Sequence, residues 1–122
     1  MATRSTIALE NADGTILQIY CHWDGYPTGV GATLEKHYNT PDKIKALLAL
    51  GSVSILDASI ECPEGHSFDN RIDGHTVFYG RDRGETDCDA GLYSCNADWR
   101  FGDRQDYNYI FRHEKQSWEV ER

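Results

Sequence analysis

Two short apolar segments near the N-terminus flank a turn sequence, and this pairing constrains the fold more than any other feature of the chain. Residues 3–9 (TRSTIAL) and residues 15–22 (TILQIYCH) are rich in β-branched side chains, which favour strands. The NADG sequence at residues 11–14 supplies turn residues, and its glycine can adopt a positive φ. The sequence therefore predicts an antiparallel hairpin. The core-facing side chains of its second strand are expected to be Leu17, Ile19 and Cys21.

Residues 28–38 and 40–51 have the features of two short helices. The second has a strong start, because Thr40-Pro41-Asp42 places a capping residue before a proline and a carboxylate in the first turn. Gly51 can end that helix. The apolar stripes of the two helices are Val30 and Leu34 in the first, and Ile44, Leu47 and Leu48 in the second. We expect both helices to pack on one face of a sheet.

The C-terminal half shows further strand patterns separated by loops. Residues 52–61 are compatible with either a strand or a helical turn. The remaining expectations are a loop at 62–73, a strand at 74–80, an acidic loop at 81–89, a short helix near 96–100, and strands at 107–112 and 117–120. A hairpin, two helices and then more strands, without regular βαβ alternation, predict an α+β fold. We expect residues 1–122 to form a single α+β domain with a mostly antiparallel β-sheet and two short helices packed on it.

The charge balance restricts the partners. The formal net charge is −8, so the chain lacks the basic face that binding to a nucleic-acid polymer requires. A local arginine pocket for a small anion, or an acidic face for a basic protein, remains open. The N-terminus has no apolar signal segment and no run approaches membrane-spanning length, so we expect a cytoplasmic protein without a membrane partner.

Four cysteines raise the questions of disulfides and metal binding. They are Cys21, Cys62, Cys88 and Cys95. In an intracellular protein free thiols are the expected state. No Cys-x-x-Cys pair is present, and the separation of Cys88 from Cys95 is too wide for a zinc knuckle. We therefore expect neither a metal nor a cofactor.

The sequence CHWDGYP at residues 21–27 is the first candidate site. A simple turn would need the glycine and the proline, whereas large aromatic side chains at a turn must be buried or bind something. Trp23 or Tyr26 can stack on a base, while His22 and Asp24 can bind base edges or ribose. The alternative is a structural corner in which Trp23 fills the core and Asp24 caps the turn.

The sequence RDRGE at residues 81–85 is the second candidate site. On an extended segment Arg81 and Arg83 would project to one side, where they could hold a phosphate with charge-assisted bonds. Glu85 completes this cluster as a candidate ligand-binding residue. The alternative is a solvated loop in which Asp82 and Glu85 neutralise the arginines. The hypothesis of a single site requires the two candidate loops to meet.

An enzymatic function has weaker support. Cys21 and His22 are neighbours on a predicted strand, so their side chains point to opposite faces and do not form a thiol–imidazole pair. A metal-free phosphodiesterase could use His22 with His66 or His75. No phosphate-binding glycine loop, dinucleotide fingerprint or zinc-protease motif occurs. We assign no catalytic residue and favour a binding protein.

Several motifs together carry a resemblance to a known group. They are TRSTIA at the N-terminus, IYCHWDGYP at residues 19–27, GRDRGE at residues 80–85 and YNYIF at residues 107–111. The pattern resembles small, largely uncharacterised accessory proteins of tailed bacteriophages and prophages. The resemblance implies an accessory protein acting in the cytoplasm of the infected bacterium. Many such proteins counter host defences by binding an effector protein or by trapping a nucleotide messenger.

Three functional hypotheses follow. The first is a sponge that sequesters a small nucleotide immune signal, cyclic or ADP-ribose-like, without turnover. The second is an anti-CRISPR-like inhibitor whose acidic segment from Asp82 to Asp89 covers a basic surface on a defence protein. The third is a small hydrolase of nucleotide signals. Exposed edge strands can also pair across subunits, which makes a homo-oligomer compatible with each hypothesis.

Overall fold

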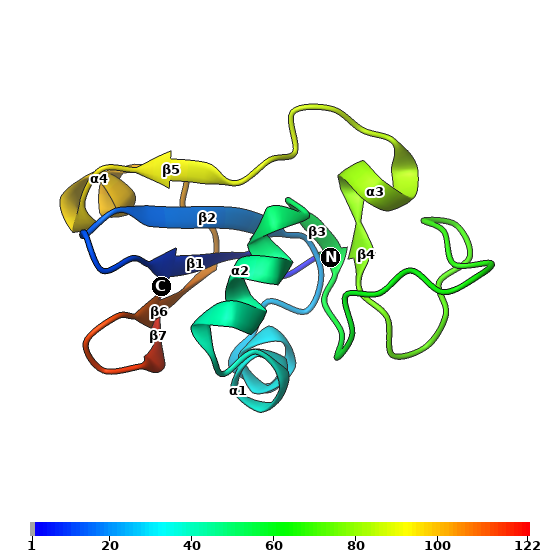
Figure 1. Cartoon of the computed structure of the whole chain (residues 1–122), viewed down its shortest axis with the longest axis horizontal. Coiled ribbons are helices and arrows are strands. Elements are labelled where there is room, and N and C mark those ends of the chain that lie inside the picture. The colour runs from blue at the N-terminus through cyan, green and yellow to red at the C-terminus, as the bar shows by residue number, and fades with distance from the viewer. Residues whose placement is uncertain (1) are drawn as a thin grey trace.

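The computed structural model describes residues 2–122 and contains one mixed sheet with short helices on both faces (Figure 1). The strands are β1 (Ser5–Glu10), β2 (Ile16–Cys21), β3 (Val53–Ile55), β4 (Val77–Phe78), β5 (Gly91–Tyr93), β6 (Tyr107–Arg112) and β7 (Ser117–Glu121). The helical elements are η1 (Pro27–Gly31), α1 (Ala32–His37), α2 (Pro41–Ala49), α3 (Tyr79–Arg83) and α4 (Asn96–Phe101). No helix in the described part of the chain has the length and apolar character needed to cross a membrane.

The sheet confirms the predicted α+β class. Its strand order is β4-β3-β2-β1-β6-β7. Strand β5 lies outside this order: it pairs with the first half of β2, whereas β3 pairs with the end of β2. The pairings of β1 with β6 and of β2 with β3 are parallel, and the remaining pairings are antiparallel. The sheet is therefore mostly antiparallel, and its two parallel pairings bring the C-terminal strands and β3 against the N-terminal hairpin.

The N-terminal hairpin forms as the sequence predicts. Ile7 lies opposite Ile19 and Leu9 opposite Leu17. The turn is closed by a bond of 2.8 Å from the Asn11 amide to the Thr15 carbonyl, and Gly14 has φ of 88°. Because β6 covers its other edge, β1 is the central strand and is buried along almost its whole length.

One face of the sheet packs against the two predicted helices. In Figure 1, α2 lies in front of β1 and β2, with α1 beside it. The Thr40 side chain caps α2 by accepting the Lys43 amide at 3.4 Å. Gly51 follows that helix with φ of 85°, and a side chain there would meet the Cys88 carbonyl oxygen at 2.5 Å. The helical side chains buried on this face are Val30, Leu34, Ile44, Leu47 and Leu48.

The opposite face is only partly covered. Trp99 of α4 is fully buried against Ala8, Ile16 and Ile110. Its indole N–H donates to the side-chain oxygen of Gln18 at 2.7 Å, which satisfies a polar residue inside β2. This helix confirms the expectation near residues 96–100. Beyond α4, the same face of β1 and β2 carries polar side chains, of which Thr6 and Gln18 are buried.

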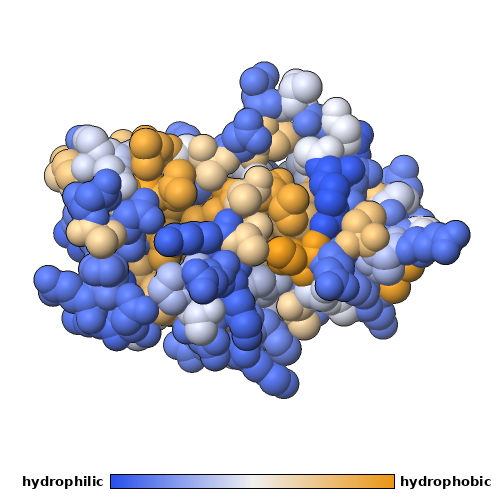
Figure 2. All heavy atoms as spheres, viewed as in Figure 1, coloured by the Kyte–Doolittle hydropathy of each residue, from blue (hydrophilic) through white to orange (hydrophobic). Residues whose placement is uncertain are grey.

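The strand expected at residues 74–80 is present but shorter, and the loop expected from residue 81 was wrong at its start. Only Val77–Phe78 of residues 74–80 form a strand, and Tyr79–Arg83 form helix α3 instead of the start of a loop. The helix forms because the Asp82 carboxylate accepts the Phe78 amide at 2.8 Å and Gly84 ends the turn with φ of 79°. Strand β5 was not expected at all. Its Leu92 is 66% exposed, and Figure 2 shows apolar surface in the region of β5.

Candidate functional site

The aromatic loop at residues 21–27 is held rigidly at the end of β2. The amides of His22 and Trp23 donate to the carbonyls of Val53 and Ser54 at 3.0 and 3.1 Å, which extends the pairing of β2 with β3. Gly25 is buried, and a side chain there would lie 2.8 Å from the Thr3 carbonyl oxygen. Only glycine therefore fits at this position of the loop.

The aromatic side chains of this loop face solvent. Trp23 is 42% and Tyr26 is 40% exposed, so Trp23 does not fill the core as the structural alternative proposed. The Tyr26 hydroxyl donates to the Asp24 carboxylate at 3.1 Å, and this bond raises the pKa of Tyr26. Asp24 itself has φ of 58°, which orients its carbonyl to accept the Val30 amide. The loop thus presents two aromatic side chains on a fixed backbone.

His22 connects the aromatic loop to the sheet face opposite α1 and α2. Its ring lies edge-on to Trp23 with centroids 4.8 Å apart, and its Nδ1 shares a hydrogen bond of 2.6 Å with the Tyr20 hydroxyl. Burial raises the pKa of Tyr20, which keeps the phenol neutral. Trp23, His22 and Tyr20 therefore form a continuous row that leads from the loop onto the sheet.

Arg81 is committed to internal bonds. Its guanidinium makes two bonds to the Asp82 carboxylate, at 2.8 and 3.1 Å, and donates to the carbonyls of Ile60 and Thr76. It also lies over the Phe78 ring at 4.7 Å. A phosphate would have to displace these bonds, so the geometry favours a structural role for this side chain.

Arg83 and Glu85 are both exposed, and neither forms an ion pair with another residue between positions 2 and 122. The Arg83 guanidinium lies over the Phe68 ring at 4.7 Å. Because residues 81 and 83 are on a helix rather than an extended segment, their side chains point in different directions, about 200° apart. The expectation that both arginines project to one side was wrong.

The two predicted loops leave the sheet from different places. Trp23 follows β2 and is bonded to Ser54, whereas Tyr79 begins α3 and donates its amide to the Ser52 carbonyl. Strand β3 lies between β2 and β4, and it runs antiparallel to β4. The loops therefore depart toward opposite ends of β3. Within residues 2–122, no hydrogen bond or ion pair joins residues 21–27 to residues 81–85.

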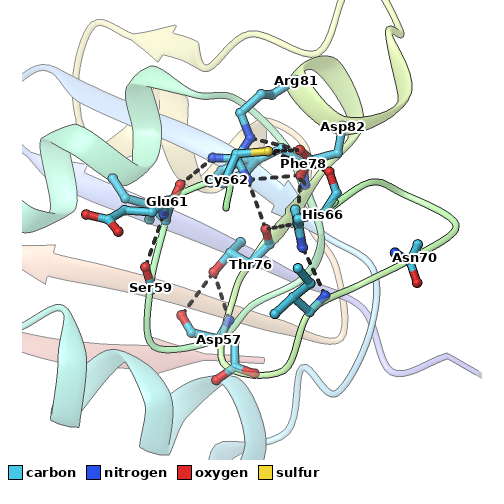
Figure 3. Close-up of polar contacts among 12 residues, drawn as sticks. Asp57, Ser59, Glu61, Cys62, His66, Asn70, Thr76, Phe78, Arg81 and Asp82 are labelled. Carbon is cyan, nitrogen blue, oxygen red and sulfur yellow. Dashed lines mark hydrogen bonds and ion pairs between the residues drawn. The ribbon is translucent and has the colours of Figure 1, made fainter. Parts of the chain in front are cut away.

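A buried polar network surrounds Asp82 and was not anticipated from the sequence (Figure 3). The Asp82 side chain is 1% exposed and lies 3.5 Å from Nε2 of His66. Burial alone would raise the pKa of Asp82, but the bonds from Arg81 and the Phe78 amide, with the Arg81 charge, lower it overall. His66 Nδ1 accepts the Ile72 amide at 3.1 Å, while Nε2 donates to the Thr76 carbonyl at 3.2 Å. Both ring nitrogens are occupied, so His66 cannot act as a general base without breaking this network.

Cys21 does not pair with the neighbouring imidazole of His22. Cys21 is buried on the helix-covered face, and burial raises its pKa to about 12. His22 contacts Tyr20 and Trp23 on the other side of β2, as the strand alternation predicted. Among residues 2–122 no group of three histidine, cysteine or carboxylate side chains has a geometry suited to a metal ion.

The sheet face opposite α1 and α2 contains a polar cavity of about 360 Å³. Its floor is formed by Thr6, Gln18 and Tyr20, which are on neighbouring positions of β1 and β2. Both Thr6 and Gln18 are buried, and Gln18 is fixed by bonds to Trp99 and to the Asp103 carbonyl. The side walls come from residues 87–93 and 103–105. In Figure 1, the first wall segment runs between α3 and β5.

The carboxylates around this cavity are unpaired. The side chains of Asp87, Asp89 and Asp103 form no ion pair or hydrogen bond within the described residues. By contrast, Arg71, Arg81, Arg100, Arg104 and Arg112 are all paired with carboxylates elsewhere. Burial, together with the charges of Glu85, Asp87 and Asp89, raises the pKa of Cys88, as expected in a negative local potential.

Sequence reasoning missed most of this cavity. Gln18 carried a usable signal, because a glutamine on a strand that also carries isoleucines is unusual unless something fixes it. Asp87 and Asp89 lie in the acidic segment that the sequence already indicated as a surface for a basic partner. Asp103 carried no signal, because it is far away in the sequence and only the fold brings it to the same cavity.

Comparisons with known proteins give no match: no family model, no curated protein and no solved structure is significantly similar to this chain.

Proposed function

We propose that this protein is a non-catalytic binding protein whose acidic sheet face covers a basic surface on a partner protein. The observation that carries the proposal is the polar cavity over β1 and β2, whose rim carboxylates Asp87, Asp89 and Asp103 form no ion pair within residues 2–122. Arg81, Arg100 and Arg112 are paired with other carboxylates, and within residues 2–122 no cation forms an ion pair with the three aspartates. The charge that remains available for a partner is therefore negative.

The chemistry of the cavity suits an arginine or lysine side chain. Carboxylates can accept bidentate bonds from a guanidinium, and the tyrosine rings in the lining, Tyr20 and Tyr93, offer flat surfaces on which it can stack. Gln18 and Thr6 on the floor are already bonded and would not have to rearrange. The exposed Trp23, joined to the cavity through His22, would serve as an aromatic anchor.

The resemblance to phage accessory proteins supplies the biological setting for the proposal. In that setting the partner is a bacterial defence protein in the host cytoplasm, and covering its basic surface would block access to nucleic acid. This function requires stoichiometric binding and no turnover. The side chains of Arg81 and His66 are already engaged in internal hydrogen bonds, which agrees with a protein that binds rather than catalyses.

A nucleotide sponge is the second candidate. The exposed pair Trp23 and Tyr26, with Asp24 between them, favours it because these side chains can stack on a base and bind a ribose. In this candidate, Arg83 would bind the phosphate of the nucleotide, because Arg81 is held by Asp82. The carboxylates of the cavity would repel phosphate, so a nucleotide would have to bind outside it.

The test uses an arginine-rich peptide as the probe, with ADP-ribose and cyclic nucleotides as the competing ligand class. We expect the peptide to bind and its affinity to fall with added salt. The variant Asp87→Asn/Asp89→Asn/Asp103→Asn should bind the peptide at least about tenfold more weakly, since each lost charge contributes about 0.5 kcal/mol. Isothermal titration calorimetry measures the affinity for the peptide and for the nucleotides.

The matched control removes the same charge elsewhere. Glu64→Gln/Asp69→Asn/Glu114→Gln substitutes three exposed carboxylates that line none of the cavity. This variant should keep the affinity within about twofold of the original protein. Equal weakening in both triple variants would mean that only net charge matters and would contradict a defined site. Tight binding of a nucleotide, abolished by Trp23→Ala, would replace the proposal with the sponge.

A further inference from the structure

A second surface, separate from the acidic cavity, lies along the edge of the sheet at β7. This strand pairs with β6 on one side, from Ser117 opposite Arg112 to Glu121 opposite Asn108. It is the last strand in the sheet order, so its other side has no strand partner in the described chain. An edge of this kind carries backbone N–H and C=O groups that can pair with an added strand.

An apolar groove runs beside this edge. It has a volume of about 470 Å³ and lies between β7 and the segment formed by η1 and α1. Its apolar surface comes from Pro27, Ala32, Tyr109, Trp118 and Val120. Val120 is 46% exposed, which leaves a large aliphatic side chain without a core to cover it. In Figure 1, α1 and β7 both lie in the lower part of the view.

The walls of the groove are fixed before anything binds. The Tyr109 hydroxyl donates to the Gly25 carbonyl at 2.8 Å, which ties the floor to the loop before η1. The Trp118 indole N–H donates to the Tyr38 carbonyl at 2.8 Å, and its ring packs edge-on against Phe111. A groove that is already ordered binds with a smaller loss of conformational entropy.

The charge at the groove rim defines the kind of occupant. Glu35 of α1 is exposed and forms no ion pair within residues 2–122. Glu119 also lies at the groove, but its carboxylate is already paired with Arg112 and Lys115. Glu35 is therefore the carboxylate at the rim that remains available, and it favours a lysine or arginine on the occupant.

We propose that the edge of β7 accepts an extended segment of a partner protein as an additional strand. Alternate side chains of that segment would be apolar and would enter the groove, and a lysine or arginine would face Glu35. Backbone pairing supplies affinity in this mode, while the side-chain pockets supply specificity. A second copy of this chain fits less well, because its β7 carries no lysine or arginine to face Glu35, and each copy has a net charge of −8. This inference does not depend on the acidic cavity.

The experiment is a selection from a random library of short linear peptides displayed against the full chain. We expect enriched peptides to alternate apolar residues and to contain a lysine or arginine at a constant offset. Repeating the selection on Glu35→Lys should remove the basic preference. The neighbouring Lys36→Glu is the matched control and should leave the consensus unchanged, because residue 36 does not line the groove.

Direct binding of one enriched peptide then tests the groove itself. Val120→Asp places a charge in the apolar groove and should weaken binding at least about tenfold. Because residue 120 is partly exposed, this variant should keep its fold, which circular dichroism checks. The triple variant of the acidic cavity should bind the same peptide normally.

Three results would overturn the proposal. They are the absence of any enriched consensus, a consensus that is insensitive to both Glu35→Lys and Val120→Asp, and a concentration-dependent dimer in analytical ultracentrifugation that Val120→Asp abolishes. The last result would assign the edge to a second copy of this chain.

Discussion

Two polar regions on either side of β3 and β4 use their charges in opposite ways. Around Asp82 the charged side chains are buried and paired with one another, and the network joins α3 to the loop at residues 57–76. Around the cavity the carboxylates Asp87, Asp89 and Asp103 are left without partners. A charge that is satisfied inside the chain contributes to stability, whereas one that is unsatisfied at a cavity is available to a ligand. The comparison separates the structural polar residues from the candidate functional ones.

The largest expected effect is on the paired region. Asp82→Asn removes the charge that holds Arg81 and lies beside His66, and it leaves a partly buried guanidinium without its carboxylate. We expect a loss of about 3 kcal/mol in the free energy of unfolding. Urea denaturation measures it, and Asp87→Asn, at an exposed position, should change stability by less than about 0.5 kcal/mol. Equal losses of stability in the two variants would contradict the distinction between the paired and the unpaired carboxylates.

The loss of stability caused by Asp82→Asn should depend on pH. The folded-state pKa of Asp82 lies below its usual value of 3.8, so folding favours the ionised carboxylate. Its contribution is therefore complete above pH 3.8 and is lost as the pH falls through the lower folded-state pKa. Glu119 and Glu121 also have lowered pKa values, so the useful quantity is the difference between the original protein and Asp82→Asn. A difference that does not shrink in acid would contradict the assignment.

The smallest expected effect concerns the second arginine of α3. Arg83 is exposed and lies over the Phe68 ring, so Arg83→Ala should cost at most about 1 kcal/mol. Arg81→Ala removes bonds to Asp82, Ile60 and Thr76 and should cost clearly more. Thermal unfolding measures the loss of stability in each variant. A larger loss for Arg83→Ala than for Arg81→Ala would contradict the assignment of Arg81 as the structural arginine and Arg83 as the free one.

The hairpin and the first two helices could be predicted because their determinants are local. Gly14, Thr40 and Pro41 each act on residues within a few positions of themselves. Helix α3 could not be predicted in the same way. It depends on a bond from the Phe78 amide to Asp82 within a segment that otherwise has a strand pattern. The parallel pairing of β1 with β6 joins residues about one hundred positions apart, which no local pattern reports.

The candidate site was predictable only in part. Trp23 and Tyr26 are exposed, which excludes burial as the reason for two large aromatic side chains at this turn, and their role in binding stays a prediction. The pairing of Arg81 with Asp82 matches the alternative that the sequence offered. The bond of Arg81 to the Ile60 carbonyl could not be predicted, because Ile60 lies far from it in the sequence. The cavity was hidden for the same reason, since its two walls come from different segments.

The most direct measurement combines stability and affinity in one variant. Asp87→Asn/Asp89→Asn/Asp103→Asn should unfold within about 0.5 kcal/mol of the original protein, because these side chains hold nothing in place. The same sample should bind an arginine-rich peptide at least about tenfold more weakly. An unchanged affinity would contradict the claim that the unpaired carboxylates form the binding surface, and a large loss of stability would show that they are structural after all.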